Sequence, residues 1–103
     1  MLMGKVAGTV VSTQKDPGLG GYKLQIVQMV DFEMNETQSY AVAVDAIGAG
    51  YGEMVIVVQG SSARLTAQTD GKPVDAAIIA IVDTVDIHAE LRYTKYEHAG
   101  REA

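Results

Sequence analysis

The sequence has no cysteine and no tryptophan, and it has only two histidines and two prolines among 103 residues. Without cysteine, disulfide bonds, thiolate zinc sites and cysteine nucleophiles are excluded. Imidazole chemistry can use only His88 and His98. The longest apolar run, residues 76–82, is far shorter than the ~20 residues of a membrane-spanning helix. Residues 1–6 lack the features of a signal peptide, so we expect a soluble intracellular protein.

Basic residues are also scarce. Lys and Arg total 8 against 13 Asp and Glu, the formal net charge is −5, and no basic residue lies between Lys23 and Arg64. Because nucleic acids and anionic membranes attract clustered positive charge, this distribution argues against both as partners. With 48% hydrophobic and 20% charged residues, the chain is too apolar to be disordered, and its length fits one domain.

Short β-branched segments separated by glycine-rich turns make up most of the sequence. They predict strands over residues 5–13, 22–30, 41–45, 53–58, 78–85 and 87–96. The last segment alternates strictly between apolar and polar residues, as a half-buried strand does. Residues 31–39 and 60–63 are predicted loops, and residues 74–77 predict one helical turn after a proline. The pattern predicts an all-β barrel or sandwich over residues 1–96, followed by a polar tail over 97–103.

Two motifs suggest chemistry, but neither has the required context. The glycine-rich segment Gly48–Gly52 lacks the Gly-Lys-Ser/Thr ending of a phosphate loop and precedes a strand, so a turn is the better interpretation. Ser61 or Ser62 with His88 or His98 would form a nucleophile and base. No Gly-x-Ser-x-Gly elbow surrounds the serines, so a hydrolase is weakly supported.

Three isolated charges leave alternatives open. Asp75 and Asp83 flank the apolar run and together could bind a hard cation, but singly placed carboxylates favour a cap and a strand-end contact. Arg64 ends the stretch without basic residues and follows four small residues. Its guanidinium is equally consistent with a bidentate clamp at an interface and with a solvated surface charge.

Four stretches, in this order and spacing, carry a family signature. They are GKVAGTVVSTQK (4–15), LQIV (24–27), VAVDAIGAGYGEMVIVVQGSSAR (42–64) and PVDAAIIAIVDTV (73–85). Together they resemble the vertex proteins of bacterial microcompartment shells, the EutN/CcmL family, over residues 3 to about 96. The resemblance implies a five-stranded barrel related to the OB-fold that assembles as a homopentamer. It further implies a non-enzymatic protein without cofactors, located in the cytoplasm within a shell whose faces are hexameric tiles.

The resemblance, with the residue types, also suggests which residues serve assembly. Small side chains fit where five copies of one loop converge, and charged side chains fit contacts between subunits and with tiles. The expected sets are an axial pore loop of Gly60, Ser61 and Ser62, a subunit interface with Arg64 and Asp45, and a rim contact of His88, Glu90 and Arg92.

An OB-type binding module for oligosaccharide or single-stranded nucleic acid is the alternative function. Such modules stack bases on aromatic side chains in a basic groove. Aromatic residues make up only 6% of this chain and its net charge is −5, so the nucleic-acid version is weakly supported.

Overall fold

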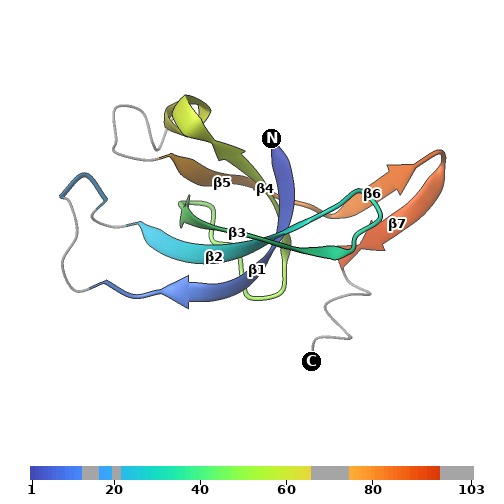
Figure 1. The fold of residues 1–103 in the computed structure, drawn as a ribbon, viewed down its shortest axis with the longest axis horizontal. Coiled ribbons are helices and arrows are strands. Elements are labelled where there is room, and N and C mark those ends of the chain that lie inside the picture. The colour runs from blue at the N-terminus through green and yellow to red at the C-terminus, as the bar shows by residue number, and fades with distance from the viewer. Residues whose placement is uncertain (13–16, 20–21, 66–74, 96–103) are drawn as a thin grey trace.

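The computed structural model describes residues 1–12, 17–19, 22–65 and 75–95. In these ranges five strands close into a barrel, and two shorter strands form a separate hairpin (Figure 1). The barrel order is β1-β2-β3-β5-β4. Its strands are β1 (Leu2–Val10), β2 (Lys23–Val30), β3 (Glu36–Asp45), β4 (Met54–Gln59) and β5 (Ala76–Ile81). The hairpin consists of β6 (Thr84–Ile87) and β7 (Glu90–Thr94). The described residues also include two short 3-10 helices, η1 (Pro17–Leu19) and η2 (Gly60–Arg64). The all-β prediction and its five-stranded barrel are confirmed.

Alternation along the strands builds the barrel interior. Adjacent strands place Val6 opposite Val27, and Val27 opposite Ala41, so one side chain in two points inward. Val27, Val55 and Val57 are completely buried. Every barrel pairing is antiparallel except that of β3 with β5, which is parallel.

A second apolar layer covers part of the outside of the barrel. Val44, Val58 and Ala77 form a cluster with Ala63 of η2, which therefore covers the outer surface of β3, β4 and β5. Strands covered on both faces read as continuous aliphatic runs. This explains the four consecutive aliphatic residues 55–58 in β4.

The third strand is longer than its polarity suggests. It begins at Glu36 rather than Ala41, because the polar residues before Ala41 pair with β2 while much of their surface faces outward. The first strand ends at Val10, and Ala76 and Ala77 belong to β5 instead of a helical turn. The predicted loop 60–63 is part of η2.

The predicted single strand over residues 87–96 is wrong. The chain reverses at His88 and Ala89, whose φ angles of 54° and 64° are left-handed, and β7 then pairs with β6. Two-residue hairpin turns with positive φ normally use Asn-Gly or Asp-Gly, so the sequence gives no turn signal at this point. The predicted strand 78–85 is likewise divided at residues 82–83. The predicted tail, 97–103, lies outside the described residues.

Candidate functional site

A buried carboxylate organises the loop that joins β3 to β4. Asp45 Oδ1 accepts hydrogen bonds from the backbone N–H groups of Ile47 (3.0 Å) and Gly48 (2.9 Å). Its Oδ2 accepts from the N–H of Ala49 (2.8 Å) and from Gln25 Nε2 (3.1 Å). Both side chains are buried, Gln25 at 1% exposure and Asp45 at 4%. Within one chain, this predicted interface residue therefore supports the loop.

The glycine-rich segment after Asp45 is a turn whose donors are already occupied. Gly48 and Gly52 have φ angles of 93° and 83°, which side-chain-bearing residues rarely adopt. The N–H of Gly50 donates to Glu53 Oε1 at 2.6 Å, beside the three N–H groups that Asp45 holds. Because the chain's own carboxylates accept these donors, the loop offers no open cradle for a phosphate.

The predicted pore loop lies at one end of the barrel, around η2 (Figure 1). Gly60 is exposed, its φ is 65°, and no atom lies within 4 Å of the position a Cβ would take. Ser61 is exposed as well, whereas Ala63 is fully buried and anchors the turn. Gly60 and Ser61 are therefore small, accessible residues in a turn that the buried Ala63 holds against the barrel. The side chains of Ser62 and Arg64 lie outside the described part of the structure.

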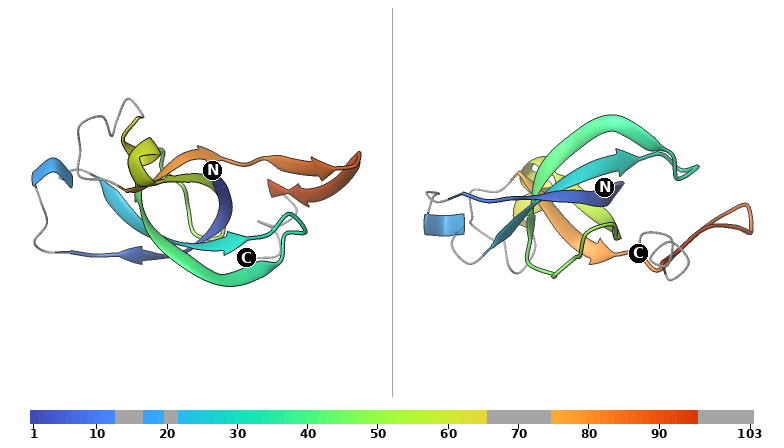
Figure 2. Two further views of the ribbon diagram at one scale, coloured as in Figure 1. Left: turned by 45° about the horizontal axis from the view of Figure 1, so that its top comes forward. Right: turned by 90° about the horizontal axis from the view of Figure 1, so that it is seen from below.

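The predicted rim residues lie on the hairpin, which projects from the barrel at the end away from η2 (Figures 1 and 2). His88 is exposed in the turn, and Glu90 is exposed at the start of β7. The Arg92 guanidinium lies 3.3 Å from Glu33 and 3.4 Å from Glu90. The structure therefore brings Glu90 and Arg92 together and fastens the hairpin to the loop before β3.

The predicted catalytic pairs are not assembled. Ser61 belongs to η2 and His88 to the turn between β6 and β7, and these elements lie at opposite ends of the molecule in both ribbon figures. Asp75 and Asp83 are exposed and lie beyond opposite ends of β5. In the described ranges no three His, Asp or Glu side chains group as a metal site would require. No helix in those ranges has the length and apolarity to cross a bilayer.

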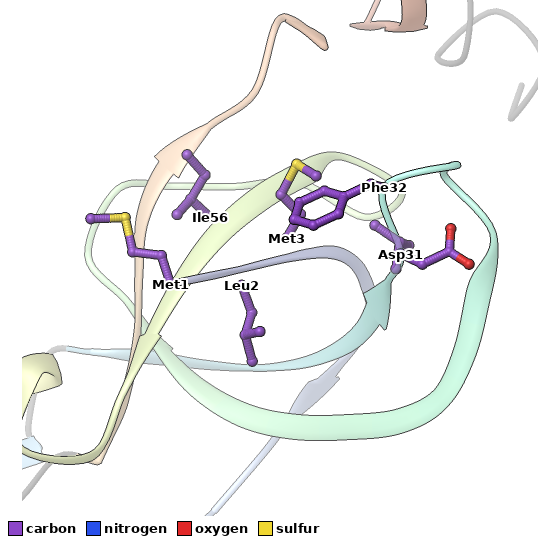
Figure 3. A pocket seen from close by; sticks show the side chains of 7 residues that line it. Met1, Leu2, Met3, Asp31, Phe32 and Ile56 are labelled. Atoms are coloured by element: carbon purple, nitrogen blue, oxygen red, sulfur yellow. The ribbon is translucent and has the colours of Figure 1, made fainter. Parts of the chain in front are cut away.

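Sequence reasoning missed an apolar pocket of about 420 Å³ beside the start of β1 (Figure 3). It is lined by Met1, Leu2, Met3, Val30, Asp31, Phe32 and Ile56. Phe32 is 73% exposed although it is the chain's one phenylalanine. The sequence signal that could have indicated this pocket is Phe32, an aromatic residue within an acidic, polar segment.

Comparisons with known proteins agree along almost the whole chain. Residues 1–83 match the family model described as ethanolamine utilisation protein EutN/carboxysome. The carboxysome shell vertex protein CcmL of Nostoc is 50% identical over 92% of this chain and 95% of its own length. The microcompartment shell vertex protein EutN of Escherichia coli is 45% identical over 82% of this chain and 90% of its own.

Solved structures show the same architecture. The Nostoc CcmL structure superposes with a TM-score of 0.87 and covers 92% of this chain and 100% of that one. A pentameric microcompartment shell protein, GrpN of Rhodospirillum rubrum, is 48% identical with a TM-score of 0.77, covering 84% of this chain and 100% of its own. The barrel described above is thus the fold of proteins that are similar in sequence as well.

Proposed function

Since this chain belongs to the family of ethanolamine utilisation protein EutN and its carboxysome counterpart, we propose that it is a structural shell protein whose pentamers cap the vertices of a bacterial microcompartment. The observation that carries the proposal is the combination of 50% identity and a TM-score of 0.87 to a shell vertex protein over almost the full chain. The 48% identical GrpN structure, which is pentameric, supports the oligomer. The OB-type binding alternative gains no support from these relatives.

The proposed capping role depends on the five-fold shape of the pentamer and requires no catalysis. A sheet of hexagonal tiles is flat and cannot close, whereas five-fold units introduce the curvature that a polyhedron needs. We propose that the neighbours of the pentamer are hexameric shell proteins and that the protein has no enzymatic activity. The location is then the shell itself, and one barrel domain over residues 1–96 supplies the capping unit.

The axial opening is assigned to Gly60, Ser61 and Ser62. The open space around Gly60 and the exposure of Ser61 support this placement, because converging copies tolerate only small groups. Ser62→Trp should weaken the pentamer or block its opening. An unchanged pentamer whose crystal structure has this loop at the periphery would contradict the placement.

The subunit interface is assigned to Arg64, with Asp45 in an indirect role. Arg64 follows the pore loop directly and is proposed to pair with a carboxylate or carbonyl of the next subunit. Truncating a desolvated arginine at an interface typically costs about 2–5 kcal/mol. Arg64→Ala should therefore favour smaller species on dilution. Asp45 supports the same interface by holding the 46–52 loop through its four accepted hydrogen bonds.

The rim contact is assigned to His88, Glu90 and Arg92. Arg92 pairs with both Glu33 and Glu90, but the Glu90 side chain is 71% exposed against 28% for Arg92, so Glu90 is the more accessible of the two charges to a tile. Charge complementarity at such a rim sets register and partner choice more than affinity. Glu90→Lys should leave the pentamer intact and impair shell closure.

The test of the function is complementation of a shell that lacks its own vertex protein. The chain is co-expressed with the hexameric tiles, and particles are examined by electron microscopy, with tiles alone and tiles plus a known vertex relative as controls. Closed polyhedra are expected with this chain. Open or elongated particles, formed although the chain is a folded pentamer and the relative closes the shell, would overturn the vertex assignment.

A further inference from the structure

A closed ring of identical subunits needs two different surfaces on each subunit, because every interface joins one surface to another rather than to its own copy. The chain carries a net charge of −5, so identical copies repel one another before they make contact. Apolar contact area must offset this repulsion. The exposed large apolar residues of the described chain therefore indicate where the ring is joined.

The first such surface is the concave pocket of Figure 3, here called the β1–β4 pocket. It combines the first residues of β1, the end of β2 with the following turn, and Ile56 of β4. Leu2 is 44% exposed and Phe32 is 73% exposed at this place. The turn that carries Phe32 is fixed by Asp31, whose Oδ1 accepts the N–H groups of Glu33 (2.9 Å) and Asn35 (3.0 Å). The pocket is thus preformed in a single subunit.

The second surface lies along the outside of β2 and β3; we call it the β2–β3 face. Tyr40 and Val42 alternate with the inward-facing Ala41 and are therefore on the same, outer side of β3. They are 58% and 52% exposed, and Ile26 of β2 is the pairing partner of Val42. No charged residue occurs between positions 37 and 44. Interface centres are depleted of charge and enriched in tyrosine.

Within the described ranges, the other exposed large apolar side chains lie on separate segments of the chain. Leu91 stands alone on the hairpin, and Ile47 and Tyr51 belong to the turn that Asp45 holds. Val11 and Leu65 lie within two residues of segments that the structure does not describe. Single exposed apolar side chains are ordinary on protein surfaces.

We propose that the β1–β4 pocket of one subunit receives the β2–β3 face of the next, with Tyr40 and Val42 packed against Phe32 and Met3. This proposal rests on the proposed pentamer and adds the surfaces that join it. The two surfaces have no residue in common, so their contact is heterologous, the kind that forms a ring when its rotation closes. The occupant of the pocket is a second copy of this chain.

Cysteine pairing tests the contact directly, because the native chain has no cysteine. The double variant Phe32→Cys/Val42→Cys is treated with a short thiol cross-linker and resolved by denaturing electrophoresis. A ladder that ends at five chains is expected. Phe32→Cys alone and Val42→Cys alone should stay monomeric on the gel, whereas the two single variants mixed and reassembled should give covalent dimers.

The matched control pairs Phe32→Cys with Leu91→Cys, which is exposed but outside both surfaces, and it should give no ladder. A second measurement guards against a variant that fails to assemble. Phe32→Glu and Val42→Glu should each raise the concentration at which half the rings dissociate by at least about ten-fold, because each would bury an unpaired charge. Leu91→Glu should leave that concentration unchanged.

Pentamers of the unmodified chain that yield no ladder from the cysteine pair, and that tolerate both glutamates, would show that other surfaces join the ring. That result overturns this inference and leaves the proposed function standing. An unmodified chain that never forms a ring would instead overturn the proposed function itself.

Discussion

Asp45 shows how a single residue sets the shape of the loop between β3 and β4. Asp45→Asn keeps the size of the side chain but replaces one oxygen by an NH2 group. If that group takes the place of Oδ2, it meets two donors, the Ala49 N–H and Gln25 Nε2. If it takes the place of Oδ1, it meets the N–H groups of Ile47 and Gly48. We expect a loss of about 2–3 kcal/mol in the free energy of unfolding, measured by urea denaturation at one protein concentration.

The matched control for this change is Asp86→Asn, an exposed aspartate in β6. It should change the free energy of unfolding by less than about 0.5 kcal/mol. Equal effects of the two substitutions would contradict the view that the buried carboxylate holds the loop.

Tyr93 makes the stability dependent on alkaline pH. Burial raises the pKa of its hydroxyl above the ordinary value of about 10, and the nearby Glu53 charge raises it further, while a hydrogen bond with the Met54 backbone lowers it. The folded chain thus keeps a proton that the unfolded chain releases. This contribution to stability is complete below about pH 10 and is lost as the pH rises toward the folded-state pKa.

Tyr93→Phe removes this titration. Thermal unfolding midpoints followed from about pH 8 to pH 11 should fall less steeply for the variant than for the native chain. At neutral pH the variant should lose about 1 kcal/mol, because the hydroxyl no longer makes its hydrogen bond. Tyr51→Phe, which alters an exposed tyrosine, should leave the pH curve unchanged. Parallel curves for Tyr93→Phe and the native chain would refute the assignment.

At the scale of the element, β1 contains two glycines that differ in their surroundings. A Cβ at Gly4 would overlap Val27 Cγ1 and lie 3.0 Å from the carbonyl oxygen of Gln28, whereas a Cβ at Gly8 would meet only Ile26 Cδ1 at 3.7 Å. Gly4→Ala should therefore destabilise the barrel by about 1–3 kcal/mol. Gly8→Ala should be neutral or slightly stabilising in the same urea titration. The reverse order would mean that β1 and β2 are further apart than described.

The β6–β7 hairpin turns on residues poorly suited to their conformation. Ala89 has a φ of 64°, a region that costs a side-chain-bearing residue about 1–2 kcal/mol. Ala89→Gly should therefore slow amide hydrogen exchange across the hairpin about five-fold or more. Ala7→Gly, in β1 and outside the left-handed region, should have the opposite sign and destabilise its strand. Unchanged exchange after Ala89→Gly would show that the turn is not strained.

The elements differ in how far the sequence could predict them. The barrel strands were predictable because β-branched residues such as Val27 and Val55 occur in short runs between glycine turns. The first half of β3 could not be predicted, because its polar residues pair with β2 but do not form an apolar face. The hairpin turn was missed because His88 and Ala89 carry no turn chemistry.

The assembled surfaces were harder to predict than the elements. Gln25 looks ordinary in the sequence, and its burial beside Asp45 depends on closure of the barrel. The β1–β4 pocket draws residues from three segments that are distant in sequence, such as Leu2, Phe32 and Ile56. Family resemblance implied the oligomer and suggested Arg64 and Asp45 for its interface, but it did not indicate the apolar surfaces proposed above.

At the scale of the whole molecule, the account predicts one closed ring. The most direct test is the native mass of the purified, unmodified chain at about 10 µM, a concentration at which an interface of micromolar affinity is largely occupied. The mass should be five times the 10.9 kDa of one chain, with no gradual series of larger species. A single species of 10.9 kDa under these conditions would contradict the pentameric vertex assignment.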